Sequence, residues 1–197
     1  RRTCRGFAEL TRFADDFVAT FRNRDDAERF RQEVEERLAA FGLRVAPEKT
    51  WVRHFDGSLL QGGKGLPAQK PETFTFLGFV HFQTRTVRGG VSIQRIPSGK
   101  ARERFVRNVR LWLKANLHQP ARTQQAHLRA MLLGFYQYFG LYYCTRTLRS
   151  VLDRVQKCWW WALRRRSQKA TRRADWSSLN RRSWFKLPSP RLAAKWV

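Results

Sequence analysis

The spacing of the apolar residues changes once along this 197-residue chain, at Pro97-Ser98-Gly99, and this change constrains the fold more than any other feature. Before it, short runs of strand-forming residues alternate with turn-forming residues. After it, apolar residues recur every three or four positions over long stretches, as they do on one face of a helix. We therefore expect an α+β chain with two modules, residues 1–97 and residues 98–197.

The first module begins with a predicted hairpin that carries acidic residues at its tip. Two runs of strand formers, residues 10–13 and 17–21, flank Ala14-Asp15-Asp16. The further strands expected in this module are short ones at residues 43–45 and 51–55, a strand-forming run at residues 73–80 and a hairpin around Gly89-Gly90.

One helix is expected between these strands, packed on one side against the sheet. Its apolar positions recur at helical spacing between Ala27 and Phe41. Asp25 or Asp26 is expected to cap its start, and Gly42 to end it.

The second module is predicted to form a bundle of three amphipathic helices. The apolar stripes run over about residues 100–118, from Pro120 to about residue 139, and from Thr145 to about Arg166. Arg and Lys occupy their outer faces. Residues 167–197 are expected to form a basic, irregular tail.

Charge is concentrated in the second module. The chain has 40 Lys and Arg against 15 Asp and Glu, a net charge of +25. Residues 1–97 hold 17 basic and 12 acidic side chains, whereas residues 98–197 hold 23 and 3. So large a charge requires a polyanionic partner. A membrane surface is the alternative to nucleic acid, but Arg interleaved with Trp and Tyr better suits phosphates and bases.

Other classes of site find little support in the composition. The three cysteines and four histidines lack the spacing of a disulfide framework or a metal site. No apolar run resembles a secretory signal or a membrane span. We expect a cytoplasmic protein, in the bacterial cytosol or nucleoid.

The Asp15-Asp16 pair is the strongest candidate for catalytic chemistry. Two like charges at the apex of an apolar hairpin are costly unless a cation compensates them. Mg²⁺ prefers one or two carboxylates together with substrate phosphates, which suits two-metal phosphoryl transfer. The alternative is a pair of solvated turn residues.

Two ordered sets of motifs resemble one family. Phe13-Ala14-Asp15-Asp16 resembles the aromatic-Ala-Asp-Asp signature of reverse transcriptases. The predicted helix at residues 25–41, Pro47-Glu48-Lys49-Thr50 and residues 74–79 then follow in the order and spacing seen in group II intron enzymes. Residues 134–139, 159–168 and 187–191 look like the maturase-specific thumb of the same family. The resemblance implies the second half of a polymerase palm in residues 1–97, including the primer-grip hairpin, and a helical RNA-binding thumb in residues 98–197.

The resemblance also implies a function. Such an enzyme of a mobile intron is an RNA-directed DNA polymerase, a nucleotidyltransferase that uses two Mg²⁺ ions. Its maturase part binds intron RNA to assist RNA splicing. The implied partners are structured intron RNA and the duplex of RNA template and DNA primer, with no membrane.

Site residues follow from the aligned motifs. Asp15 and Asp16 are the implied metal-binding catalytic residues, and Phe13 stands where the family usually has Tyr, beside the primer end and the nucleotide. Lys49 aligns with a lysine near the incoming triphosphate and is a candidate general acid. A solvent-exposed lysine at a strand end is the alternative for that position.

Residues that contact nucleic acid are implied in both modules. Phe76, Leu77 and Gly78 look like the primer grip, where Gly permits close approach of the backbone, although the aromatic residues there also suit a core. Tyr136, Tyr142, Tyr143 and Trp161 are candidates for stacking on unpaired bases. The basic residues expected to bind nucleic acid are Arg104, Arg107, Arg110, Lys114, Arg146, Arg149, Arg164, Arg165, Arg166 and Lys169.

The chain also departs from the family. The fingers and the first catalytic aspartate have no counterpart in these 197 residues, so the two-metal site is expected to be incomplete and the chain alone not to polymerise DNA. A separately encoded amino-terminal half is then a possible partner. The alternative is a non-catalytic RNA-binding maturase-like module or a truncated fragment. An unrelated basic ribosome-associated protein would leave the acidic hairpin unexplained.

Overall fold

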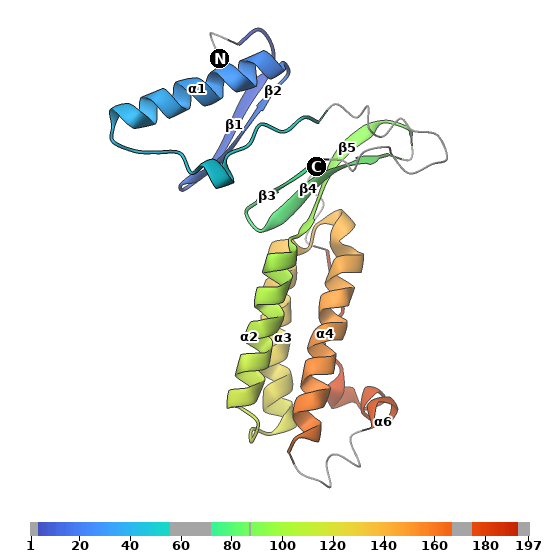
Figure 1. The fold of residues 1–197 in the computed structure, drawn as a ribbon. Helices are drawn as coiled ribbons and strands as arrows, with labels where there is room; N and C mark the ends of the chain where they lie inside the picture. The colour runs from blue at the N-terminus through green and yellow to red at the C-terminus, as the bar shows by residue number, and fades with distance from the viewer. Residues whose placement is uncertain (1–3, 56–71, 87, 167–174, 193–197) are drawn as a thin grey trace. The chain divides into compact units, whose positions relative to one another are not determined.

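The computed structural model describes residues 4–55, 72–86, 88–166 and 175–192, and its fold is α+β (Figure 1). The chain divides into two compact units. The first comprises Arg1–Phe76 and Phe82–Ile93, and the second comprises Leu77–His81 and Gln94–Val197. Among the described residues, no helix is long and apolar enough to cross a membrane.

The first unit contains the predicted hairpin. Strands β1 (Ala8–Phe13) and β2 (Asp16–Phe21) pair antiparallel, with Phe13 opposite Asp16 at the turn. Helix α1 (Arg24–Ala40) packs on one face of this hairpin, where the Phe30 ring lies 5.2 Å from the ring of Phe21. The sequence therefore predicted this hairpin and its helix correctly.

The start of α1 differs from the prediction. Asn23, not Asp25 or Asp26, is the N-cap residue, and it makes no side-chain capping bond. Asp26 lies in the first turn, where it is only 2% exposed. Its carboxylate accepts hydrogen bonds from the Arg5 backbone N–H at 3.0 Å and from the Arg29 side chain at 2.5 Å. This aspartate therefore ties the incoming chain to the helix, a long-range contact that the local pattern could not distinguish from a cap.

The end of α1 is as predicted. Gly42 has a φ of +70°, in the left-handed region that favours glycine. Its N–H donates to the carbonyl of Ala39, and the Leu43 N–H donates to the carbonyl of Leu38, both at 2.9 Å. These two bonds form a Schellman motif, which satisfies the last carbonyls of the helix.

The strands predicted at residues 43–45 and 51–55 are wrong. Residues 43–46 and 51–55 have no regular structure, and between them lies a short 3-10 helix, η1 (Pro47–Lys49). Local strand propensity does not make a strand unless a neighbouring strand supplies hydrogen-bond partners.

A second sheet has the order β3 (Thr73–Phe76), β4 (Phe79–Arg85) and β5 (Val91–Pro97). Leu77 and Gly78, with φ of 49° and 78°, form the two-residue turn that joins β3 to β4. Positive φ at both positions is typical of a type I′ hairpin turn. The run at residues 73–80 is thus two strands and not one. The hairpin predicted around Gly89-Gly90 is confirmed, and the Thr86 N–H donates to the Gly90 carbonyl at 2.7 Å.

The second unit contains three long helices that lie side by side, α2 (Gly99–Ala115), α3 (Ala121–Phe139) and α4 (Thr145–Arg164) (Figure 1). Ser98 caps α2, because its hydroxyl accepts from the Ala101 N–H at 3.1 Å. A 3-10 turn, η3 (Tyr142–Cys144), leads into α4. The three predicted helices are confirmed, with boundaries shifted by a few residues.

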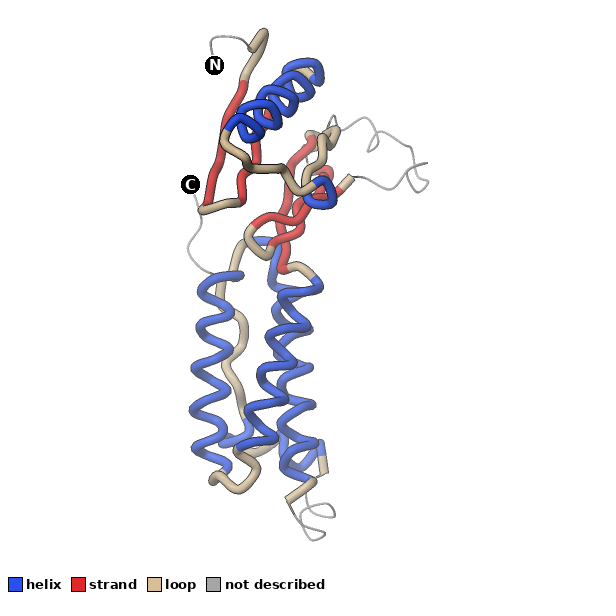
Figure 2. Tube along the Cα trace, turned by 60° about the vertical axis from the view of Figure 1, so that its left-hand side comes forward, coloured by secondary structure: helices blue, strands red, loops and turns tan. Residues whose placement is uncertain are grey.

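The core of the second unit includes part of the segment predicted to be irregular. Helix α6 (Trp176–Asn180) and the 3-10 turn η4 (Ser183–Phe185) follow α4, and the loop after η4 runs along the helices (Figure 2). Phe185 is fully buried and stacks on Trp159, with ring centroids 4.9 Å apart. Leu187 is also buried. The tail prediction is therefore wrong for these residues, because their apolar side chains complete the core.

Candidate functional site

The acidic pair lies at the turn of the β1–β2 hairpin. Asp15 is in the turn, Asp16 is the first residue of β2, and both side chains are exposed. The preceding residue, Ala14, has a φ of 51°, and its carbonyl accepts from the Arg12 side chain at 2.8 Å. A tight, side-chain-braced turn therefore presents both carboxylates to solvent.

The donor chemistry of this pair fits Mg²⁺ in part. Carboxylate oxygens are the ligands that this ion takes from proteins, usually one or two with phosphates and water filling the other positions. Within the described ranges, no group of three or more His, Cys, Asp or Glu side chains could hold a metal ion. Asp15 and Asp16 could thus supply two carboxylates, with further ligands from outside these residues.

Two other predicted site residues lie in the first unit. Phe13 ends β1 directly opposite Asp16, and its side chain is 63% exposed. A large exposed ring beside the carboxylates is available to a ligand. Lys49 ends η1, also exposed, so neither of its two interpretations is excluded by burial.

The Leu77–Gly78 turn belongs to the second unit, which holds it by three contacts. The Gly78 carbonyl accepts from the Ser98 N–H at 2.8 Å, and the Leu77 carbonyl accepts from the Tyr138 hydroxyl at 2.9 Å. Phe79, just after the turn, stacks on Tyr138 with ring centroids 5.7 Å apart. Phe76, at the end of β3, is half-buried. Sequence reasoning missed Tyr138, because 61 positions separate it from Leu77.

Gly78 is needed for its backbone conformation more than for space. A Cβ at this position would lie 3.4 Å from the ring of Phe139, an ordinary van der Waals contact. Its φ of 78° is the constraint, since other L-residues rarely adopt it.

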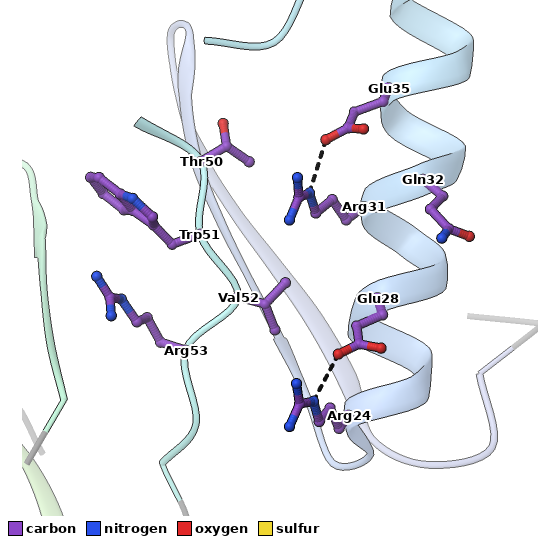
Figure 3. A pocket seen from close by; sticks show the side chains of 9 residues that line it. All are labelled: Arg24, Glu28, Arg31, Gln32, Glu35, Thr50, Trp51, Val52 and Arg53. Carbon is purple, nitrogen blue, oxygen red and sulfur yellow. Dashed lines mark hydrogen bonds and ion pairs between the residues drawn. The ribbon is translucent and has the colours of Figure 1, made fainter. Parts of the chain in front are cut away.

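A pocket of about 600 Å³ lies between α1 and residues 50–53 in the first unit (Figure 3). From α1, Arg24 and Arg31 point toward that segment, paired with Glu28 at 2.7 Å and Glu35 at 2.9 Å. The hydrogen bond with Glu28 raises the pKa of Arg24. Because these arginines are already paired, the lining is close to neutral and does not point to an anionic ligand.

Most of the predicted nucleic-acid-binding residues are exposed on the second unit. Lys169 lies outside the described residues. Arg164 is half-buried, with its guanidinium carbon 4.9 Å from the ring centroid of Trp160 and 5.3 Å from that of Trp161. Arg166 donates to the carbonyl of Gln119, and burial lowers its pKa. The exposed members of the predicted set are Arg104, Arg107, Arg110, Lys114, Arg146, Arg149, Arg165 and Arg166.

The aromatic candidates divide by burial. Tyr142, Tyr143 and Trp161 are more than half exposed. Tyr136 is 3% exposed, and its hydroxyl donates to the Pro188 carbonyl at 3.2 Å. Burial raises the pKa of this hydroxyl. Stacking of a base on Tyr136 is therefore excluded, because the ring is part of the core.

Residues 3–81 match the family model described as reverse transcriptase (RNA-dependent DNA polymerase). No curated protein and no solved structure matches the chain. The matched stretch contains the acidic hairpin, α1, η1 and the Leu77–Gly78 turn. This part of the chain is thus similar in sequence to RNA-directed DNA polymerases, which act on a nucleic-acid template and primer.

Proposed function

We propose that the chain is part of an RNA-directed DNA polymerase of the group II intron type, which also binds its intron RNA to assist splicing. The observation that carries the proposal is the Asp15-Asp16 pair. It lies at an exposed hairpin turn, within the stretch that matches reverse transcriptases.

In this proposal, residues 1–97 are the second half of the palm and Asp15 and Asp16 hold Mg²⁺. When bound there, the ion supplies the charge that activates the primer 3′-hydroxyl and stabilises the leaving pyrophosphate. Phe13 packs against the primer end or the nucleotide, and Lys49 lies near its triphosphate. The Leu77–Gly78 turn, held rigidly by Tyr138 and Ser98, positions the primer backbone.

Residues 98–197 are, in the same proposal, the thumb and the maturase-specific RNA-binding domain. Their 23 basic and 3 acidic side chains supply the attraction for intron RNA and for the template–primer duplex. The buried core between the helices gives the exposed basic side chains of α2, α3 and α4 a fixed scaffold.

A metal-binding measurement tests the role of the acidic pair. Mn²⁺ replaces Mg²⁺ and is titrated by electron paramagnetic resonance into the chain bound to an RNA template with a DNA primer. Asp15→Asn combined with Asp16→Asn should weaken Mn²⁺ binding about tenfold or more, because these carboxylates are the proposed ligands. The matched control is Asp25→Asn, an exposed aspartate in the first turn of α1, which should leave binding unchanged. Equal Mn²⁺ affinity in all three proteins would reject the metal site.

Activity of the full gene product tests the reaction. It should extend a DNA primer on an RNA template, and Asp15→Asn should lower the rate about a hundredfold or more. It should also bind its intron RNA in preference to an unrelated RNA of equal length.

A second candidate function is RNA binding without catalysis. It is favoured by the burial pattern, since among the described residues every fully buried apolar side chain lies in the second unit, which carries most of the charge. A full gene product that promotes splicing but extends no primer would support this alternative.

A further inference from the structure

Helices α2 and α4 run in the same direction, and two side-chain contacts join them (Figure 1). Arg154 forms an ion pair with Glu103 at 2.7 Å, and further along both helices the Arg110 side chain donates to the Cys158 sulfur at 3.3 Å. The second contact lies later in the sequence on both helices, as expected for two parallel helices.

Two stripes of side chains border this contact. Arg107, Arg110 and Lys114 are spaced i, i+3, i+7 and so share one face of α2. Arg154, Cys158 and Trp161 are spaced i, i+4, i+7 on α4. We call these six residues the α2–α4 seam. The α2 stripe is roughly 10 Å long, at 1.5 Å per residue.

The charge of the seam is strongly positive. Arg107, Arg110 and Lys114 are all exposed. Glu103, which adjoins them, is already paired with Arg154, and that hydrogen bond lowers the pKa of the Glu103 carboxyl. The Glu103 carboxylate is therefore ionised and paired with Arg154, while Arg107, Arg110 and Lys114 are exposed to solvent.

Trp161 marks one end of the seam and is 55% exposed, whereas Trp159, two positions earlier, is fully buried. The Arg164 guanidinium lies over the Trp161 ring. This exposed indole beside a cation leaves apolar area in water. It suits a partner that offers both a planar π-system and negative charge.

We propose that the α2–α4 seam is a binding track for RNA, in which phosphates lie along Arg107, Arg110 and Lys114 and an unpaired base stacks on Trp161. This proposal rests on the proposed RNA-binding function and assigns it to one face of the second unit. A membrane surface fits poorly, since the apolar faces of both helices, with Val109 and Val155, are fully buried in the core.

The test uses the full chain and two RNA hairpins whose duplexes are equally long. One hairpin is blunt, and the other has a single-stranded 3′ extension. Affinity is measured by fluorescence anisotropy over a range of salt concentrations. The variants are Trp161→Ala, Trp161→Phe and the double variant Arg107→Ala/Lys114→Ala. The charge-matched control is Arg122→Ala/Arg129→Ala, which removes two exposed cations from α3.

Each variant has a distinct expected result. Trp161→Ala should weaken binding of the extended hairpin about tenfold and leave the blunt hairpin within twofold, because only an unpaired base can stack. Its salt dependence should not change, and Trp161→Phe should retain most of the affinity. Arg107→Ala/Lys114→Ala should weaken both RNAs and reduce the slope of log K against log salt by about two.

The outcomes separate this proposal from the function on which it rests. If the unaltered chain binds neither hairpin, the RNA-binding function itself is wrong. Suppose that it binds both, but Trp161→Ala keeps its full affinity for the extended hairpin, or Arg122→Ala/Arg129→Ala loses as much affinity as Arg107→Ala/Lys114→Ala. The binding track is then wrong, and the RNA-binding function stands. Circular dichroism of every variant checks that the helices are intact. If Trp161→Ala is unfolded, the affinities of Trp161→Phe and of the charge variants test the binding track.

Discussion

Gln124 shows how one residue organises the interior of the second unit. Its side chain is fully buried, yet both ends of its amide are bonded. The oxygen accepts from the Trp159 indole N–H at 2.9 Å, and the nitrogen donates to the Asn116 carbonyl at 2.6 Å. The residue thus joins three parts of the unit, namely α3, α4 and the loop after α2.

Replacing Gln124 with Leu keeps its approximate volume and removes both bonds. The Trp159 indole N–H would then be buried without a partner, while the Asn116 carbonyl would keep only its bond from the Gln119 N–H. The free energy of unfolding should fall by about 1–3 kcal/mol. Urea unfolding followed by far-ultraviolet circular dichroism measures this change. Gln137→Leu, at an exposed position of the same helix, should shift it by less than about 0.5 kcal/mol. Similar losses in both variants would contradict the structural role of Gln124.

Among the elements, the β3–β4 hairpin depends on a helix for the position of its turn. The Tyr138 hydroxyl holds the Leu77 carbonyl, and the Ser98 N–H holds the Gly78 carbonyl. A two-residue turn alone would leave the tip of a hairpin free to move. In the proposed polymerase, this rigidity is what a backbone-positioning turn needs.

Tyr138→Phe should loosen the turn without disturbing the helix. The loss of one hydrogen bond, worth about 1 kcal/mol, predicts that the Ser98 amide exchanges its hydrogen roughly fivefold faster. Hydrogen exchange resolved by NMR measures this rate. Tyr143→Phe removes a hydroxyl from a ring that is 54% exposed and should leave the Ser98 rate unchanged. An unchanged rate in Tyr138→Phe would mean that the Tyr138 hydroxyl does not help to hold the turn.

Across the whole molecule, burial is distributed unequally between the two units. In the first unit, Phe7, Leu10, Phe13 and Phe41 are each more than half exposed. The described core lies in the second unit, around Trp159 and Phe185. Since apolar burial is the main source of stability, the two units should differ in their resistance to opening.

Hydrogen exchange of the free chain should reveal this difference. Slowly exchanging amides of α2, α3 and α4 should be protected at least about a hundredfold more than those of β1 and β2, a difference of about 2.7 kcal/mol in opening free energy. Mass spectrometry of peptides from each unit is sufficient to measure it. Equal protection in β1–β2 and α4 would show that the first unit is stable despite its exposed apolar residues.

Much of this structure could be predicted from local patterns. The strand runs around Asp15-Asp16, the glycine at the end of α1 and the three helical stripes were all correct, because each depends on residues only a few positions apart. The hairpin with Asp15 and Asp16 at its turn was also predicted from the sequence, and so was the similarity of this stretch to reverse transcriptases. Errors occurred where a neighbour in space decided the outcome, as at Asp26 and at residues 43–45.

The sequence by itself determined the order and type of the main elements, the excess of positive charge after residue 98 and the placement of two aspartates at a turn. Only the tertiary structure decided which side chains meet. Trp159 and Gln124 are 35 positions apart, Arg110 and Cys158 are 48 apart, and Tyr138 and Leu77 are 61 apart. Apolar period and turn chemistry act over a few residues, whereas these contacts depend on how whole helices pack. For the same reason, the exposure of Trp161 and the burial of Trp159 could not be read from the repeated tryptophans in which both occur.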